Sequence, residues 1–342
     1  MRGSLVRYLT TAALAAAMTL PAAAATQLIG AGSSFDYPFF SKAFYIYSQK
    51  NPDVTVNYQS IGSGGGIQQF TAKNVDFGAT DVPMNAEELA RAGQPVLQVP
   101  VALGGAAIAY NLPNVNGTVH LTRQVLADIY LGKILKWNDA QIARLNKGMS
   151  LPDMSIIVVH RSDGSGTSYI FTDFLSHVSP EWKSKVGVGK SVSWPAPSSV
   201  GAKGTEGVAG QVRSTPGAIG YVELAYVIEN KMSAAILQNS AGKWVACSEA
   251  TVAAAAATKP GVNAKNFSIV DAPGANSYPI SGYSWVVVYK KPADSTRAKA
   301  LYDVLSWLVG PQGQSYARSV DYVPLPVNVQ NAASATLRQM QR

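Results

Sequence analysis

The sequence predicts an α/β protein with two domains. Short apolar segments, turns of Gly and Ser, and helical segments follow one another repeatedly, which is the order of βα units on a parallel or mixed sheet. The chain has 342 residues and is 47% hydrophobic. That is more than a single core usually holds, and it also argues against a disordered chain.

The first two βα units lie within the first eighty residues. A strand at 27–29 precedes a Gly turn, where Ser33 or Ser34 can cap a helix, and a proline then suits the first turn of a helix ending near residue 49. The second unit has an alternating strand at 54–58, a glycine-rich loop at 62–66 and a short helix at 67–72.

Later segments continue this pattern without an internal sequence repeat. Branched aliphatic residues predict strands, and apolar positions at helical spacing predict helices. We expect a strand at 156–159, a loop at 161–167, a helix at 169–175, a closely packed Ala-rich helix without assigned function at 252–257, a strand at 285–289 and a helix at 296–309.

The amino terminus has the layout of a secretory signal peptide. Arg2 and Arg7 precede an apolar run at 9–20, and small residues follow. A membrane anchor is the alternative, but a spanning helix needs about 20 apolar residues. Cleavage after residue 25 would begin the mature chain at Thr26. No cysteine lies near this position, so we expect an exported protein without a lipid anchor.

Charge and cysteine content exclude several classes of protein. Removing the two signal-peptide arginines leaves 26 basic and 20 acidic residues, a net charge of +6. This excess favours anions, but the basic residues are scattered, which argues against nucleic-acid binding. Cys247 is the single cysteine, so the chain can form neither an internal disulfide nor a thiolate metal cluster.

Three loops point to the chemistry of the ligand. They lie at 32–35, 62–66 and 161–168, and each is built from Gly and Ser, follows a strand and opens a helix. Unpaired backbone N–H groups and the positive end of the helix dipole make such places suitable for tetrahedral anions. Each loop alone could be only a capped turn. Three of them, one containing Arg161, favour anion binding.

These loops belong to a series of motifs that resembles the periplasmic phosphate-binding proteins of the phosphate-specific ABC transport system. The likeness spans nearly the whole mature chain. The motifs lie, in family order, at 30–35, 61–66, 75–81, 129–133 with Trp137, 161–168 and 216–223.

The resemblance implies a type II periplasmic binding protein fold, with mixed sheets flanked by helices, a hinge crossed twice and a central cleft. Domain I would comprise 26–101 and 279–342, and domain II would comprise 102–278. It also implies a periplasmic protein that delivers phosphate to the membrane permease of the importer. We expect a monomer without cofactor or metal. Secretion beyond the cell stays open.

Nine phosphate-binding residues are implied by the resemblance, four from one wall of the cleft and five from the other. At the position of Ser34 the family often has Thr, so this chain keeps a hydroxyl there. The residues are Ser34, Phe35, Ser63, Asp81, Arg161, Asp163, Ser165, Gly166 and Thr167.

Asp81 and Arg161 give this set a physical meaning. Arg161 is the single full positive charge in the set, and Asp163 can hold its guanidinium. An ionised carboxylate can only accept hydrogen bonds, so Asp81 suits the hydroxyl of protonated phosphate and disfavours fully ionised sulfate. The bland alternatives are that Asp81 caps the turn before Pro83 and that Arg161 pairs with a surface acid.

An enzyme is the main alternative in function. His120, His160 and His177 lack a paired zinc spacing, no serine lies in a nucleophile elbow, and the Gly-Lys-Ser at 189–191 lacks the earlier glycine of a P-loop. We therefore expect no catalytic residues. A secreted phosphomonoesterase or a surface adhesin that reuses this fold remains the second hypothesis.

Overall fold

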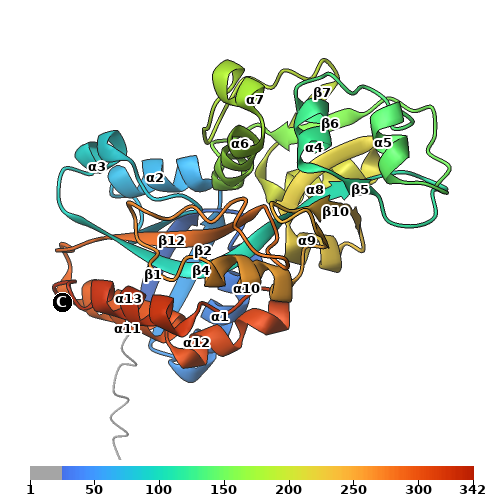
Figure 1. Cartoon of the computed structure of the whole chain (residues 1–342). Coiled ribbons are helices and arrows are strands. Elements are labelled where there is room, and N and C mark those ends of the chain that lie inside the picture. The colour runs from blue at the N-terminus through green and yellow to red at the C-terminus, as the bar shows by residue number, and fades with distance from the viewer. Residues whose placement is uncertain (1–24) are drawn as a thin grey trace, which may run out of the picture.

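The computed structural model describes residues 25–342 and has a long mixed sheet with helices on both of its faces (Figure 1). The strands are β1 (Thr26–Gly32), β2 (Val54–Ser60), β3 (Phe77–Thr80), β4 (Val96–Tyr110), β5 (His120–Leu121), β6 (Ile157–Arg161), β7 (Ser199–Ala202), β8 (Ala218–Glu223), β9 (Ser233–Ala234), β10 (Ile236–Gln238), β11 (Trp244–Val245) and β12 (Ser281–Tyr289). The α-helices are α1 (Tyr37–Lys50), α2 (Ser63–Thr71), α3 (Ala86–Ala92), α4 (Arg123–Tyr130), α5 (Ala140–Leu145), α6 (Gly166–Val178), α7 (Pro180–Lys185), α8 (Gly204–Ser214), α9 (Leu224–Glu229), α10 (Glu249–Ala257), α11 (Ser295–Val309), α12 (Pro311–Ser315) and α13 (Val327–Leu337), and Ala317–Val320 form a 3-10 turn.

The main sheet has the strand order β2-β1-β3-β12-β4-β8-β6-β7, with β9 paired to β4. β1 is parallel to β2 and β3, and β6 is parallel to β7 and β8, whereas β12 and β4 run antiparallel to their neighbours. A small second sheet has the order β11-β10-β5. The α/β class predicted from the sequence is confirmed.

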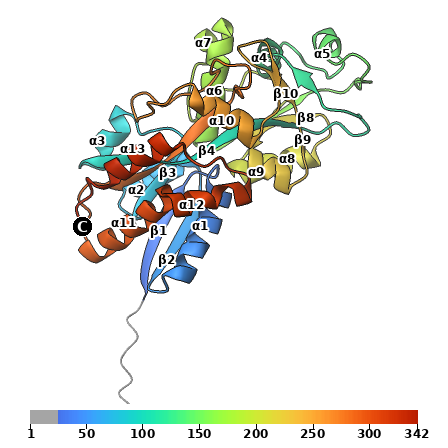
Figure 2. The same ribbon diagram turned by 60° about the horizontal axis from the view of Figure 1, so that its bottom comes forward.

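One strand joins the two lobes that Figures 1 and 2 show. Nine of the first ten residues of β4, all except Val101, pair with β12 in what we call the first lobe, which contains β1, β2, β3 and β12. The last five, Ala106–Tyr110, pair with β8 in the second lobe, which contains β6, β7 and β8. The lobes therefore share a continuous strand.

β12 shows how the first lobe is layered. Val286 and Val288 pack into the hydrophobic cluster of α1, α11 and α13, whereas Val287 and Tyr289 pack into the cluster of α2 and α3 on the opposite face. Alternate residues of a strand point to opposite faces, so helices from both ends of the chain cover one strand. The second lobe has its own aromatic centre, in which the rings of Phe171 and Tyr221 stack.

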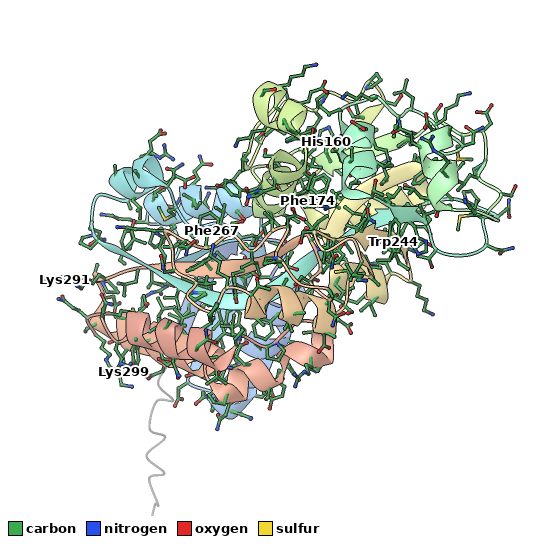
Figure 3. The ribbon with its side chains drawn as sticks, in the orientation of Figure 1. His160, Phe174, Trp244, Phe267, Lys291 and Lys299 are labelled. Carbon is green, nitrogen blue, oxygen red and sulfur yellow. The ribbon has the colours of Figure 1, made fainter. Side chains whose placement is uncertain are left out.

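Figure 3 shows the side chains of both lobes. Lys291 and Lys299 lie at the outer edge of the first lobe, away from the contact between the lobes. In the second lobe, the ring of His160 stacks on Trp194 with centroids 5.1 Å apart. His160 is therefore packed against an aromatic ring.

The expected helices and strands are present, but two loops are shorter than predicted. The segment 62–66 is not a loop, because α2 already begins at Ser63 and only Gly62, with φ of +81°, makes the turn. Arg161 is the last residue of β6, and α6 begins at Gly166 rather than near Tyr169. Small residues in the first turn of each helix concealed the helical start.

The expected signal peptide lies outside the described residues. Within residues 25–342, no helix combines the length and the hydrophobicity that crossing a membrane would require.

Gly66 should be sensitive to the smallest enlargement. A Cβ atom there would lie 2.4 Å from Cα of Gly32 and 2.6 Å from the carbonyl oxygen of Ala31, and backbone atoms cannot yield cheaply. We expect Gly66→Ala to destabilise the fold by about 1 to 3 kcal/mol, measured by thermal unfolding. Gly210→Ala is the matched control: a Cβ there meets nothing within 4 Å, and the variant should be as stable or more stable. Equal stability of Gly66→Ala and wild type would contradict the packing described.

Candidate functional site

The candidate site lies where five strands end. β1, β2 and β3 are parallel, so their carboxyl ends share one edge of the first lobe and lead into Ser33, Gly62 and Asp81. β6 and β7 are parallel in the second lobe. β6 ends at Arg161, and β7 ends at Ala202, three residues before Thr205. Ligands of α/β sheets bind at such edges, because loops and helix N-termini converge there.

Ser63 joins the two lobes. Its hydroxyl oxygen accepts hydrogen bonds from the amide of Asp81 at 3.2 Å and from the amide of Gly166 at 3.1 Å. Gly166 is the first residue of α6. One hydroxyl from the first lobe therefore occupies the N-terminus of a helix from the second.

Glycines allow this close approach. The amide of Gly64 donates to the carbonyl of Gly164 at 2.8 Å, and a Cβ on Gly64 would lie 3.1 Å from Cα of Gly164. A Cβ on Gly62 would lie 2.1 Å from a carboxylate oxygen of Asp163. Glycine is required here by the contact between the lobes.

Asp81 is buried and is held by hydroxyl groups. Ser33 donates to its Oδ1 atom, Ser284 lies 2.9 Å from the same atom, and Thr167 of the second lobe donates to Oδ2 at 3.2 Å. Burial raises the pKa of the carboxyl, and these hydroxyls oppose that rise. The positive charge of Arg161 opposes it as well.

Arg161 and Asp163 form a two-bond ion pair. Nε and Nη2 of Arg161 donate to the two oxygens of Asp163 at 2.7 and 2.6 Å. Burial alone would lower the pKa of Arg161, but Asp163 reverses this and raises it. Burial likewise opposes ionisation of Asp163, but the guanidinium lowers its pKa. Both groups are therefore charged.

Thr205 connects Arg161 with the first lobe. Its hydroxyl accepts from Nη1 of Arg161 at 3.3 Å and lies 2.9 Å from the hydroxyl of Ser34. Its amide donates to the oxygen of Ser34 at 2.9 Å. Tyr226 also reaches this place, because its hydroxyl donates to the carbonyl of Ser34 at 2.7 Å.

Two of the nine residues expected from the sequence direct their side chains elsewhere. The hydroxyl of Ser165 accepts from the amide of Ser168 at 3.0 Å and caps α6. The ring of Phe35 is buried and meets Tyr322 edge to face, with centroids 6.4 Å apart. The amide of Phe35 nevertheless faces the cluster, since it donates to Ser33 at 3.0 Å.

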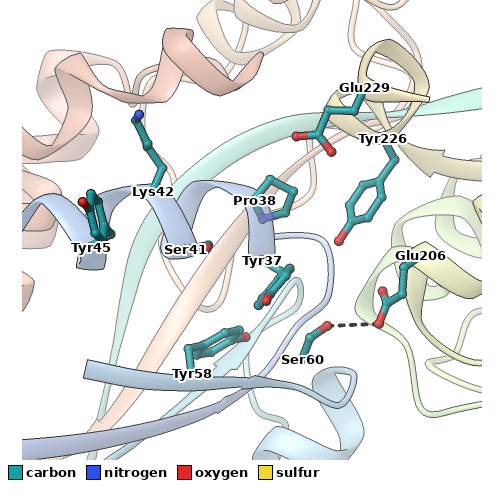
Figure 4. A pocket seen from close by; sticks show the side chains of 10 residues that line it. All are labelled: Tyr37, Pro38, Ser41, Lys42, Tyr45, Tyr58, Ser60, Glu206, Tyr226 and Glu229. Carbon is teal, nitrogen blue, oxygen red and sulfur yellow. Dashed lines mark hydrogen bonds between the residues drawn. The ribbon is translucent and has the colours of Figure 1, made fainter. Parts of the chain in front are cut away.

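A solvent-open cavity of about 690 Å³ borders the cluster (Figure 4). It lies between α1 and β2 of the first lobe and α8 and α9 of the second, and Tyr58 and Tyr226 form part of its wall. The hydroxyl of Ser60 approaches Glu206 across it at 3.4 Å.

Four residues of the cluster were not found from the sequence. The sequence predicts Ser33 only as a possible helix cap, and its motifs do not include Thr205, Ser284 or Tyr226. A signal for Thr205 existed, because Gly204 and Thr205 follow a short strand and open a helix in the same way as the other loops. Ser284 and Tyr226 lie inside a strand and a helix and had no local signal.

The comparisons with known proteins agree with one another. A family model described as the PBP superfamily domain matches residues 19–312. The phosphate-binding protein PstS of Xylella fastidiosa strain Temecula1 is 47% identical over 317 residues, which cover 91% of this chain and 85% of the relative. The PstS protein of Pasteurella multocida is 47% identical over 308 residues, which cover 89% and 88%.

A solved structure shows the same fold at low identity. The phosphate-binding protein of Stenotrophomonas maltophilia has a TM-score of 0.73 and 21% identity, and the match covers 91% of this chain and 94% of that one. All three proteins are named for binding and none is named as an enzyme. The chain belongs to the periplasmic phosphate-binding proteins, the family that its sequence motifs resemble.

Proposed function

We propose that the protein binds inorganic phosphate between its lobes, with selectivity over sulfate, and delivers it to the membrane permease of the phosphate ABC importer. The relatives that share almost half of its sequence are named phosphate-binding proteins. The observation that supports the proposal best is the cluster that contains Asp81 and Arg161. It combines one guanidinium, one acceptor carboxylate and several hydroxyl and amide groups from both lobes.

These groups suit a tetrahedral oxyanion that carries a hydrogen. The guanidinium, the hydroxyls and the amides at the start of α2 and α6 can donate to ligand oxygens, and charge-assisted bonds contribute about 1.5 to 3 kcal/mol each. Asp81 can accept the hydrogen of mono- or dibasic phosphate. Sulfate has no hydrogen to give, so it would leave a buried carboxylate facing a lone pair.

The proposed ligand residues are the nine that the sequence motifs imply. Ser165 and Phe35 would contribute through the loop backbone, because their side chains cap a helix and fill the core. The proposed domains are 26–101 with 279–342, and 102–278, and β4 would carry one of the two crossings. We place the mature protein in the periplasm as a monomer, exported by the signal peptide and free of a lipid anchor.

Arg161→Ala should weaken phosphate binding at least about tenfold, because at least one charge-assisted bond of about 1.5 to 3 kcal/mol is lost. Isothermal titration of the phosphate-stripped protein measures this. Arg144→Ala on the exposed face of α5 is the control and should bind as wild type does. Unchanged affinity in Arg161→Ala would contradict the site. A rate of hydrolysis of a chromogenic phosphate ester that Arg161→Ala abolishes would instead favour an enzyme.

Asp81→Asn should reduce the preference for phosphate over sulfate, since an amide can donate to an oxygen that has no hydrogen. Sites built around a ligand hydrogen discriminate by about 10⁴ to 10⁵, and most of that ratio should disappear. Competitive titration with phosphate and sulfate gives the ratio. Asp303→Asn, which removes a surface carboxylate paired with Lys299, should leave it unchanged. Equal affinities of the wild type for phosphate and sulfate would contradict the hypothesis that Asp81 sets the selectivity.

Phosphate should favour the closed arrangement of the lobes, because it would contact both walls and a ligand shifts an equilibrium only by differential contacts. Small-angle scattering of the stripped protein should show a smaller radius of gyration after phosphate is added. Sulfate at the same concentration is the control and should leave the radius unchanged. An identical radius with and without phosphate would contradict closure.

A further inference from the structure

A second carboxyl group lies behind Asp81. The hydroxyl of Ser284 lies 2.5 Å from Oδ2 of Asp36 and 2.9 Å from Oδ1 of Asp81. Ser284 is on β12, at the point where its register with β4 shifts between Ser284 and Trp285. Such a bulge changes the direction of a side chain and is frequent beside functional sites. The extra residue is Val101 of β4, and opposite this bulge the Ser284 hydroxyl lies between the two carboxyls.

Asp36 does not serve as an ordinary helix cap. It holds the N-cap position of α1, but its side chain makes no capping hydrogen bond. The residue is fully buried, and within residues 25–342 its Oδ1 atom is also buried and has no hydrogen-bond partner. A buried carboxyl with a free oxygen needs a reason other than capping.

One hydroxyl hydrogen cannot satisfy two carboxylates. Ser284 has a single O–H donor, so if Asp36 and Asp81 were both ionised, one of them would face an oxygen lone pair. A proton on Asp36 removes the conflict. Asp36 then donates to the oxygen of Ser284, and Ser284 donates to Asp81. Both carboxyl contacts of Ser284 then join a donor to an acceptor.

The proton belongs on Asp36 rather than on Asp81. Burial and the nearby charge of Asp81 raise the pKa of Asp36 well above its usual value, and a single hydrogen bond from Ser284 opposes the rise. Asp81 receives hydrogen bonds from three hydroxyls and lies in the field of Arg161. The two carboxyls titrate as a pair, with the first ionisation on the Asp81 side.

Other titratable groups also face this pair. Glu223, at the end of β8, is buried, its pKa is raised well above the usual value by burial, and Asp36 adds to the rise. Tyr58 of β2 and Tyr322 after the 3-10 turn are near both carboxyls, and burial keeps them neutral by raising their pKa values. Glu223 is therefore the other group that could bind a proton here.

We propose that Asp36 is a positioning and specificity-determining residue of the ligand site, which holds a proton and, through Ser284, keeps Asp81 an acceptor for the hydrogen of the ligand. The inference rests on the proposed binding of a protonated oxyanion at Asp81. It assigns Asp36 no direct contact with the ligand.

The consequence is a linkage between binding and pH. A bound anion raises the pKa of Asp36 further, since it adds negative charge to the same site. Binding then favours the protonated form, and affinity falls as the pH rises above the pKa of Asp36 in the ligand-free protein. The limiting slope for one linked proton is about tenfold per pH unit. The side chain of Asp36→Asn cannot ionise, so the phosphate affinity of this variant lacks the pH dependence that comes from Asp36.

The test is the phosphate affinity of wild type and Asp36→Asn from about pH 5 to pH 10, read as the ratio of the two dissociation constants. The ionisation of phosphate cancels in this ratio. We expect wild type to weaken relative to the variant by more than about tenfold as the pH rises. A ratio constant within about twofold would overturn the inference. Glu223→Gln is the matched control and should follow wild type; a slope lost in Glu223→Gln instead would also overturn it.

A stability measurement covers the case in which a variant folds poorly. The pKa of Asp36 is higher in the folded than in the unfolded protein, so its stabilising protonation is complete below the unfolded value, near 3.8, and is lost as the pH rises through the folded value. The melting temperature of phosphate-free wild type should therefore fall relative to Asp36→Asn and Asp36→Ser with rising pH. Parallel melting curves would place no proton on Asp36 and would overturn the inference.

The two proposals can fail separately. If wild type binds no phosphate at any pH, the proposed function is wrong, and the melting curves still test the proton on Asp36. If wild type binds phosphate and the ratio to Asp36→Asn does not change with pH, only the role of Asp36 is wrong.

Discussion

The carboxylate of Asp81 lies buried at the contact between the lobes and must be surrounded by donors. Ser33 and Ser284 come from the first lobe, and Thr167 comes from the second. An unpaired buried charge would cost several kcal/mol, and hydrogen bonds from both lobes offset that cost. The positive charge of Arg161 also stabilises the carboxylate of Asp81. Because Arg161 is paired with Asp163, it does not make the site strongly cationic. The site can therefore recognise an anion by directed hydrogen bonds rather than by net charge.

The fold supplies the positions that these donors need. Parallel strands bring three loops to one edge of the first lobe, and β4 runs from this lobe into the second. Glycines at 62, 64 and 164 let the backbones touch, and Ser284, beside a register shift between β12 and β4, contacts Asp81. Each of these features is local, but together they place groups more than eighty residues apart in one hydrogen-bonded cluster.

Sequence reasoning could predict the features that have local signals. The strand, Gly/Ser turn and helix order gave the α/β class and the segments that carry Ser34, Ser63 and Arg161. Asp81 was implied only by the resemblance to the family. Sequence reasoning could not predict Ser284, because a serine inside a strand has no signal until strand pairing places it. Thr205 had a signal, but the strand before it is four residues long and largely exposed. Asp36 holds the N-cap position of α1, and only the structure shows that its side chain is buried and makes no capping hydrogen bond.

The direction of one hydrogen bond tests this account most directly. Neutron diffraction from crystals grown with phosphate would locate the hydrogen between a ligand oxygen and Asp81. The account predicts that a phosphate hydroxyl donates to the carboxylate over a short distance, about 2.5 to 2.7 Å. A phosphate whose oxygens all point away from Asp81, or a hydrogen found on Asp81 and donated to the ligand, would contradict it.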